Sequence, residues 1–249
     1  MTLFHFTLSA LIAALTGMAA AADERPPAQR YQECLSEVEK FPKDAFEDAI
    51  QWGREGGGGP AEHCAASALM ALGLYPDAAK RLEALAQSVK EGPRFKANIL
   101  AQAGQAWLLA DDATRAEAVA TTALQLMPKA PVLLISRARA RAERNDYAGA
   151  KADLDIALVE APGHPDALAF RAAAFRFLDK PAAARSDTDA ALARDPAHPE
   201  ALLERGILKR LAGDKDGARE DWIKLLEVAP ETGAADTARA NLEKMDVTK

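Results

Sequence analysis

Apolar residues recur along the chain at helical spacing, and the resulting helix pairs repeat every 34 residues. Three columns of residues keep this period: Leu100, Leu134, Leu168 and Leu202; Ala116, Ala150, Ala184 and Ala218; Pro128, Pro162, Pro196 and Pro230. A fixed period of this length that joins two helical segments is the signature of a repeat protein. The pattern predicts four regular units, residues 97–130, 131–164, 165–198 and 199–232.

A fourth column consists of small residues, and it predicts how the two helices of a unit pack. Its members are Gly104, Ala138, Ala172 and Gly206, again 34 positions apart. Helices that cross closely need small side chains at the contact, so we expect Gly206 to face Ala218 of the second helix. With 49% hydrophobic but only 6% aromatic residues, the chain has the Ala- and Leu-rich composition of an all-α fold.

The chain before residue 97 keeps the pattern less well. Gly73, Tyr75 and Ala78 repeat the spacing of the corresponding residues in the later units, which predicts a longer unit over 59–96. Residues 23–58 have helical spacing but no repeat phase. We interpret them as an irregular helical hairpin that caps the array, because terminal units of solenoids are atypical. The run Gly56–Gly59 is expected to form a flexible link, since it lacks the Lys and Ser or Thr of a phosphate-binding loop.

The period, the small residues and the closing proline together resemble the tetratricopeptide repeat. That resemblance implies a right-handed superhelical solenoid of antiparallel helix hairpins with about five units, which binds peptides or proteins. It also implies that residues 233–249 form a C-terminal capping helix and tail. The family's concave groove is made by the first helices of the units, and on this chain it would present Asn98, Gln105, Leu108, Ile135, Arg139, Arg176, Phe177, Ile207 and Arg210.

Three arginines and Phe177 in such a groove suggest a client segment with apolar anchors and some negative charge. The alternative is that these arginines pair with neighbours such as Glu143 and form an ordinary solvated surface.

A second set of charges also keeps the period. Arg137, Arg171 and Arg205 are each followed sixteen residues later by an acid, namely Asp153, Asp187 and Asp221. In the preceding unit both positions change together, to Ala103 and Val119. We interpret the six residues as structural ion pairs between the two helices of a unit. The alternative is a row of arginines that binds acidic ligands.

The first 22 residues contain no charged side chain and end in four alanines, which predicts a cleaved signal peptide and a periplasmic or secreted protein. The alternative is a retained anchor, but the apolar run is shorter than the roughly 20 residues that span a membrane. The net charge of -6 favours neither nucleic acid nor an anionic membrane surface as a partner. In an exported protein, Cys34 and Cys64 predict one disulfide, with two free buried thiols as the alternative.

No catalytic pattern or nucleotide motif stands out, so we expect no enzyme, no cofactor and no metal. His164 and His198 are 34 residues apart, and His63 adjoins Cys64, but neither arrangement has the clustered spacing of a metal site. The sequence therefore favours a non-catalytic protein- or peptide-binding adaptor of the cell envelope. The alternative is a structural subunit or assembly factor that self-associates through its solenoid ends.

Overall fold

The computed structural model describes residues 25–247, and thirteen helices make up this part of the chain without any strand. The all-α fold class is confirmed. In chain order the helices are α1 (Pro27–Lys40), α2 (Pro42–Arg54), α3 (Gly58–Ala71), α4 (Tyr75–Ser88), α5 (Pro93–Leu109), α6 (Ala113–Leu126), α7 (Pro131–Glu143), α8 (Tyr147–Glu160), α9 (Pro165–Phe177), α10 (Pro181–Arg194), α11 (Pro199–Leu211), α12 (Lys215–Val228) and α13 (Gly233–Val247).

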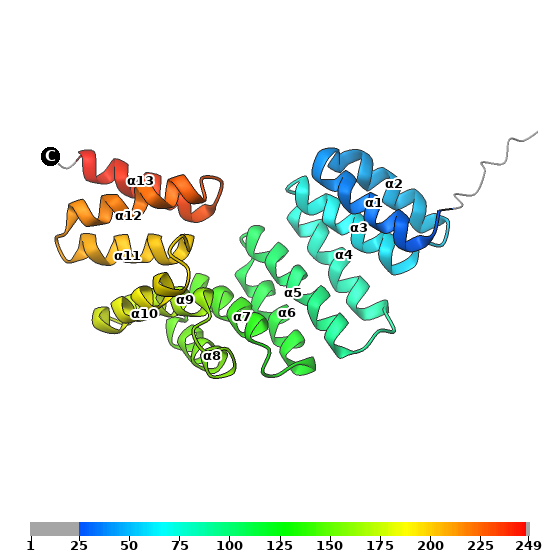
Figure 1. Cartoon of the computed structure of the whole chain (residues 1–249). Coiled ribbons are helices and arrows are strands. Elements are labelled where there is room, and N and C mark those ends of the chain that lie inside the picture. Colours follow the sequence, from blue (N-terminus) through cyan, green and yellow to red (C-terminus); the bar gives the residue numbers. More distant parts are fainter. Residues whose placement is uncertain (1–24, 248–249) are drawn as a thin grey trace, which may run out of the picture.

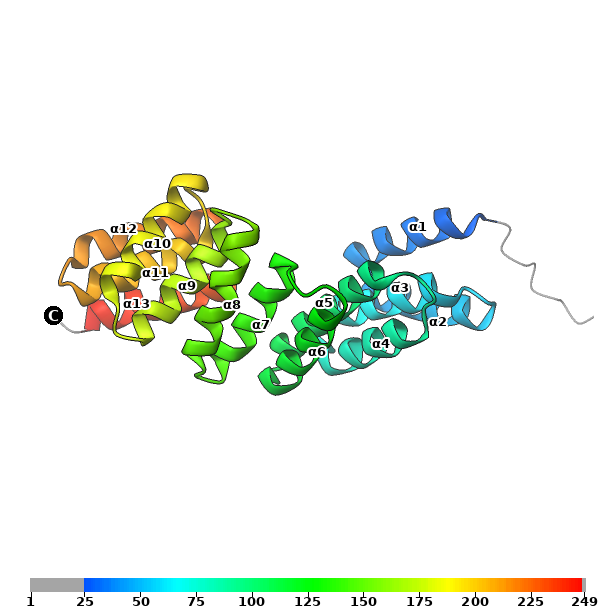
Figure 2. The same cartoon turned by 90° about the horizontal axis from the view of Figure 1, so that it is seen from below.

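Each helix packs against the next, and the first helices of neighbouring units also touch: α5 contacts α7, α7 contacts α9, and α9 contacts α11. Figure 1 shows the result as a bent array with α1–α4 at one end, α11–α13 at the other, and α6 and α8 on the outer side of the bend. Figure 2 shows the same array from below as an elongated body. The superhelical repeat architecture is therefore confirmed.

One backbone feature recurs in every hairpin from α3–α4 to α11–α12. The residue two positions before the second helix begins has a positive φ: 73° at Gly73, 57° at Asp111, 63° at Asn145, 55° at Asp179 and 90° at Gly213. Glycine, Asn and Asp tolerate this left-handed conformation best, which explains the residue types in this column. In three hairpins the following aspartate caps the second helix, with Asp112, Asp146 and Asp214 each accepting a backbone N–H three residues on. The turn chemistry thus fixes the antiparallel hairpin.

The small-residue column packs differently from our expectation at its last member. Gly206 faces the indole ring of Trp222, which is fully buried, and a Cβ on Gly206 would lie 2.3 Å from Trp222 Nε1. The expected partner Ala218 is not among the atoms that crowd this glycine. The glycine is therefore required by the largest side chain of the second helix rather than by a close approach at an alanine.

The glycine run near residue 57 does not form a flexible link. Helix α2 ends at Arg54 and α3 already begins at Gly58, so only residues 55–57 separate the two helices. A Cβ on Gly57 would lie 2.6 Å from the Trp52 ring, and Gly56 has a φ of 97°. The run therefore forms a tight turn that lets Trp52 pack beneath it.

A disulfide between Cys34 and Cys64 joins α1 to α3. Helix α1 contains no fully buried residue, and its apolar contacts with the body come from half-buried Leu35 and Val38 beside Cys34. The cross-link is consequently a principal attachment of α1.

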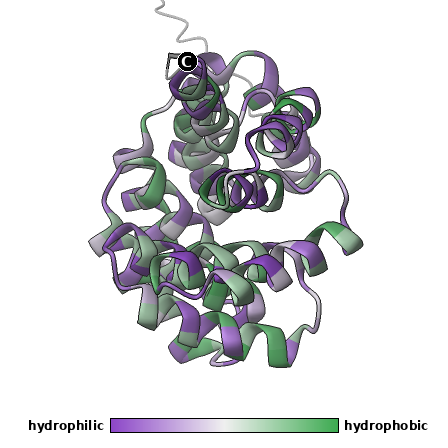
Figure 3. Ribbon diagram, turned by 90° about the vertical axis from the view of Figure 1, so that its left-hand side faces the viewer, coloured by the Kyte–Doolittle hydropathy of each residue, from purple (hydrophilic) through white to green (hydrophobic). Residues whose placement is uncertain are grey.

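At the other end, α13 buries Ala235, Ala238 and Met245 and exposes Asp236, Arg239 and Glu243. Figure 3 shows the hydrophobic and hydrophilic positions alternating along the helices of the array. Within residues 25–247, none of the helices has the length and apolar character needed to cross a membrane. The predicted signal peptide, residues 1–22, lies outside the described residues.

Candidate functional site

The nine predicted groove residues lie on α5, α7, α9 and α11, the first helices of the four regular units. Five of their side chains are exposed and three are half-buried. Ile135 differs, because it is only 7% exposed and belongs to the hydrophobic core. It therefore lacks the free surface to contact a client as predicted. The small residue at the corresponding position of the neighbouring helices, Ala101 and Ala169, leaves room for the larger Ile135 side chain to turn inward.

A cavity of about 320 Å³ lies where α5, α6 and α7 meet on this face. Leu108 and Leu109 form its apolar wall, and the exposed Arg139 and Glu143 supply its polar side. Asp111 and Ala113 complete the lining. The cavity thus combines two leucines with a cation and two carboxylates, a composition suited to an apolar side chain whose neighbouring backbone is hydrogen-bonded.

Arg176 is not free to bind a client, because it forms a two-point ion pair with Glu204 of α11. Arg176 Nε lies 2.5 Å from Glu204 Oε1, and Nη2 lies 3.2 Å from Oε2. Glu204 is almost completely buried, and that burial raises the pKa of its carboxyl although the Arg176 hydrogen bond opposes the change. The pair links α9 to α11, so its role is structural.

Phe177 is exposed but held in place. Its ring stacks on that of Tyr147 with centroids 4.1 Å apart and an interplanar angle of 6°. The guanidinium of Arg176 lies 4.1 Å from the Phe177 ring centroid on the same cluster. This stack lies at the turn edge of the array, where α8 begins and α9 ends.

The charges on this face nearly cancel. Arg176 is paired with Glu204, and Arg139 shares its cavity with Glu143 and lowers the pKa of Asp166 through its charge. Arg210 remains as an exposed cation without an ion pair in the part of the chain that the structure describes. The groove is thus closer to neutral than the sequence suggested.

The three predicted Arg–Asp pairs form two-point ion pairs within their units. Arg137 reaches Asp153 at 2.9 and 2.7 Å, Arg171 reaches Asp187 at 2.7 and 2.9 Å, and Arg205 reaches Asp221 at 2.9 and 2.6 Å. The three aspartates are buried, at 2 to 7% exposure. These geometries place the arginine heads on protein carboxylates and away from any role as free ligand-binding cations.

A second set of contacts, which the sequence analysis missed, joins one unit to the next. Arg141 donates to Glu117 at 3.0 Å and to Asp153 at 2.9 Å, so it bridges α6 and α8. Arg171 likewise donates to Asp155 of α8 at 2.9 Å. The signal was available, because Glu117 and Arg141 have the same 24-residue separation as Glu83 and Trp107, whose side chains bond at 2.6 Å.

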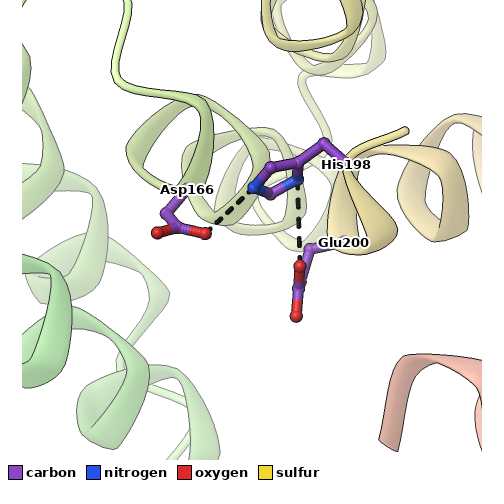
Figure 4. Close-up of side chains that lie close together, drawn as sticks. All are labelled: Asp166, His198 and Glu200. Atoms are coloured by element: carbon purple, nitrogen blue, oxygen red, sulfur yellow. Dashed lines mark hydrogen bonds and ion pairs between the residues drawn. The ribbon is translucent and has the colours of Figure 1, made fainter. Parts of the chain in front are cut away.

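His198 joins two units at the start of their first helices. Its Nε2 donates to Asp166 Oδ1 at 2.9 Å, and its Nδ1 accepts the backbone N–H of Ala201 at 3.3 Å and lies 3.8 Å from Glu200 Oε2. Figure 4 shows the two carboxylates beside different nitrogens of the ring. Burial lowers the pKa of His198, but the Asp166 hydrogen bond and the charges of Asp166, Glu200 and Asp195 raise it above its ordinary value.

These three residues have metal-ligating chemistry, and their ligand atoms lie within 4.8 Å of one another. The arrangement nevertheless fits a metal poorly. An ion on Nε2 would have Asp166 beside it, whereas Glu200 lies at the opposite nitrogen, which already accepts a backbone N–H. His164, the other histidine of the predicted pair, is not part of this group. We interpret the trio as a helix cap and a link between units.

His63 has an equally clear structural role. Its Nδ1 bonds the hydroxyl of Tyr31 at 2.8 Å, and its Nε2 bonds Gln102 Oε1 at 2.9 Å. Cys64 is in the disulfide with Cys34, which excludes it as a catalytic thiolate or a zinc ligand in this state. His63 therefore connects α1, α3 and α5.

Several solved structures are similar to this chain in fold. TTC0263, a thermophilic tetratricopeptide-repeat protein of Thermus thermophilus, is 19% identical with a TM-score of 0.59, covering 71% of this chain and 95% of its own. MamA from Desulfovibrio magneticus is 19% identical with a TM-score of 0.55, covering 70% and 97%. The Cut9–Hcn1 structure is 14% identical with a TM-score of 0.61, covering 86% of this chain and 46% of that one. No family model and no curated protein sequence matches the chain.

Proposed function

We propose that this chain, a solenoid with the tetratricopeptide-repeat fold, is a non-catalytic adaptor of the cell envelope that holds a segment of a partner protein in the groove of its first helices. The observation that carries the proposal is the cavity of about 320 Å³ beside Arg139. It is the place where exposed apolar and charged groups of two successive units converge on that face.

The lining indicates what kind of segment fits. Leu108 and Leu109 favour an aliphatic side chain in the cavity, and the exposed fraction of Leu109, 46%, shows that this surface is available. Arg139 and Glu143 are then placed to bond the carbonyl and amide groups of the bound segment. Because the neighbouring charges nearly cancel, a client with an apolar anchor and a mostly uncharged backbone is favoured over a strongly acidic one.

The envelope location rests on the signal-like residues 1–22 and is supported by the disulfide. Disulfides persist in oxidising compartments such as the periplasm and are rare in the cytosol. N-terminal sequencing of the protein purified from fractionated cells tests this part: a mature chain that starts between residues 21 and 23 in the envelope fraction is expected. An intact Met1 in the cytosolic fraction would refute the location.

The interaction role is supported by the fold of the similar structures. One of them, Cut9–Hcn1, is a hetero-tetramer, so this architecture carries a contact with another chain there. The polar outer side of α13 fits the end of an array better than a self-association surface. Light scattering of the mature protein over a range of concentrations tests the latter, and a constant monomer mass is expected.

The decisive experiment is affinity capture from an envelope extract with three versions of the mature chain. The double variant Leu109→Ser/Arg139→Glu alters two exposed groove residues without touching the buried ion pairs. The control Arg185→Glu reverses an exposed arginine on α10, a second helix. We expect the partner to be recovered with the wild type and the control and lost with the double variant. Recovery of the same proteins by all three versions would sink the groove proposal.

A further inference from the structure

A second hollow lies on the other side of α5, between the second helices α4 and α6. It consists of two adjoining cavities of about 260 and 420 Å³ that share Glu83, Gln87, Ala118 and Val119. Leu100 and Trp107 of α5 form its floor. These two residues follow Asn98 and Gln105 by two positions, which is about 200° around a helix, so this hollow faces away from the groove of the first helices.

The hollow exists because the charge pattern is interrupted in this unit. In the next units, Arg141 fills the equivalent space by joining Glu117 to Asp153, and Arg171 does so by joining Asp155 to Asp187. Between α4 and α6, Ala103 and Val119 stand where the later units have an arginine and an aspartate. Trp107 stands where Arg141 stands one unit later. Shorter and apolar side chains therefore leave the space open.

The charges around this hollow are mainly positive, although the whole chain has a net charge of -6. Lys80, Lys96 and Arg115 line it, against Glu83 as the single carboxylate. Glu83 accepts the indole N–H of Trp107 at 2.6 Å, and Arg115 lies 4.5 Å from the Trp107 ring centroid. Lys96 forms no ion pair within residues 25–247. The hollow therefore has an apolar floor and a cationic rim.

We propose that the α4–α6 hollow binds an acidic amphipathic segment of a partner protein, with an aliphatic side chain on Trp107 and Val119 and carboxylates at Lys96 and Arg115. This surface is separate from the groove of the first helices and does not depend on it. The aliphatic anchor removes apolar surface from water, and the carboxylates match the rim charges, which sets orientation and makes binding weaken with salt.

The test uses a defined probe and the mature full-length chain. The probe is a fluorescein-labelled peptide of about 14 residues with leucines at helical spacing and glutamates between them. A matched peptide carries lysines in place of the glutamates. Fluorescence anisotropy is expected to show saturable binding of the glutamate peptide and at least about tenfold weaker binding of the lysine peptide.

The key variant is Ala103→Arg/Val119→Asp, because it installs in this unit the pair that the chain already has at Arg137 and Asp153. The variant should fold, since the later units accept this pair, and it fills the hollow with paired charge. We expect at least about tenfold weaker binding of the glutamate peptide, equal to a loss of at least about 1.4 kcal/mol. Lys96→Glu, which leaves the floor intact, is expected to weaken binding several-fold and serves if the double variant does not fold.

Two results would overturn the proposal: no saturable binding of the glutamate peptide, or equal binding by the wild type, the double variant and Lys96→Glu. The variant Leu109→Ser/Arg139→Glu separates the two surfaces and is expected to bind the peptide as the wild type does. If this variant loses the peptide while the α4–α6 variants keep it, the peptide occupies the groove of the first helices and the hollow is not the site.

Discussion

Gly206 of α11 lies directly against the indole of Trp222 in α12, at a distance that leaves no room for a methyl group. A Cβ on Gly206 would lie 2.3 Å from Trp222 Nε1, whereas a Cβ on the equivalent Gly104 would meet its nearest neighbour, Ala116 O, at 3.8 Å. Trp222 is fully buried and donates its indole N–H to Leu203 O at 3.2 Å, so it is held in place.

The two glycines should therefore respond in opposite ways to alanine. Gly206→Ala overpacks the core and should lower the free energy of unfolding by about 1–3 kcal/mol. Gly104→Ala meets only ordinary contacts, gains helix propensity, and should leave stability unchanged or raise it by up to about 1 kcal/mol. Urea denaturation followed by circular dichroism measures both. Equal effects of the two substitutions would show that Trp222 can move aside.

The contrast between these glycines also shows how far the sequence reaches. The 34-residue period marks the regular hairpins, because the helices, their turns and their closing prolines repeat in every unit. It marks the Arg137–Asp153 type of pair for the same reason. The period cannot show which large residue a small one accommodates, since Leu154, Thr188 and Trp222 share one column and only Trp222 requires a glycine opposite.

Contacts that occur once are invisible to a repeat argument. Arg176 and Glu204 are 28 residues apart, and one unit earlier these positions hold Ala142 and Phe170, so no periodic signal marks the pair. The turn at Gly57 was also missed, because glycine by itself indicates flexibility and the packing of Trp52 beneath it depends on the tertiary fold. The groove surface was predicted as a face, but the side chains that remain available on it depend on such single contacts.

The Arg171–Asp187 pair gives a prediction about buried charge. Arg171→Ala leaves the carboxylate of Asp187, which is 7% exposed, without its cation and should cost about 3 kcal/mol. The double variant Arg171→Ala/Asp187→Val reproduces the Ala103 and Val119 combination of the earlier unit and should lie within about 1 kcal/mol of the wild type. Urea midpoints of the three proteins test this. If the double variant is as unstable as the single one, the pair contributes net stability and our interpretation of it as a specificity device is wrong.

His198 predicts a dependence of stability on pH. Its pKa is higher in the folded protein than the unfolded value of about 6.5, so its contribution is fully present below about pH 6.5 and is lost as the pH rises through the folded pKa. Asp166 has a lowered pKa, chiefly through its hydrogen bond with His198, so its contribution requires a pH above about 3.9. The pair should therefore stabilise the protein most between about pH 4 and 6.5.

The variant His198→Asn tests this window, because Asn keeps a good N-cap and removes the titrating ring. The loss of unfolding free energy relative to the wild type should be larger at about pH 5.5 than at about pH 8.5. Asp166→Asn should reduce the same pH difference, since it removes the partner charge. A loss that is equal at both pH values would mean that His198 acts only as a helix cap.

The disulfide gives a prediction that is local to one end of the array. Its cysteines are 30 residues apart in sequence, and closing a loop of this length contributes about 3–4 kcal/mol. Because α1 has no fully buried residue, the variant Cys34→Ala/Cys64→Ala should release α1 while the helices beyond α4 stay folded. Hydrogen exchange read by mass spectrometry should show lost amide protection in α1, with protection in α7–α12 unchanged, and reduction of the wild type should give the same pattern. Loss of protection along the whole array at once would instead show that the N-terminal hairpin and the regular units unfold as a single cooperative body, and that the cross-link stabilises all of it.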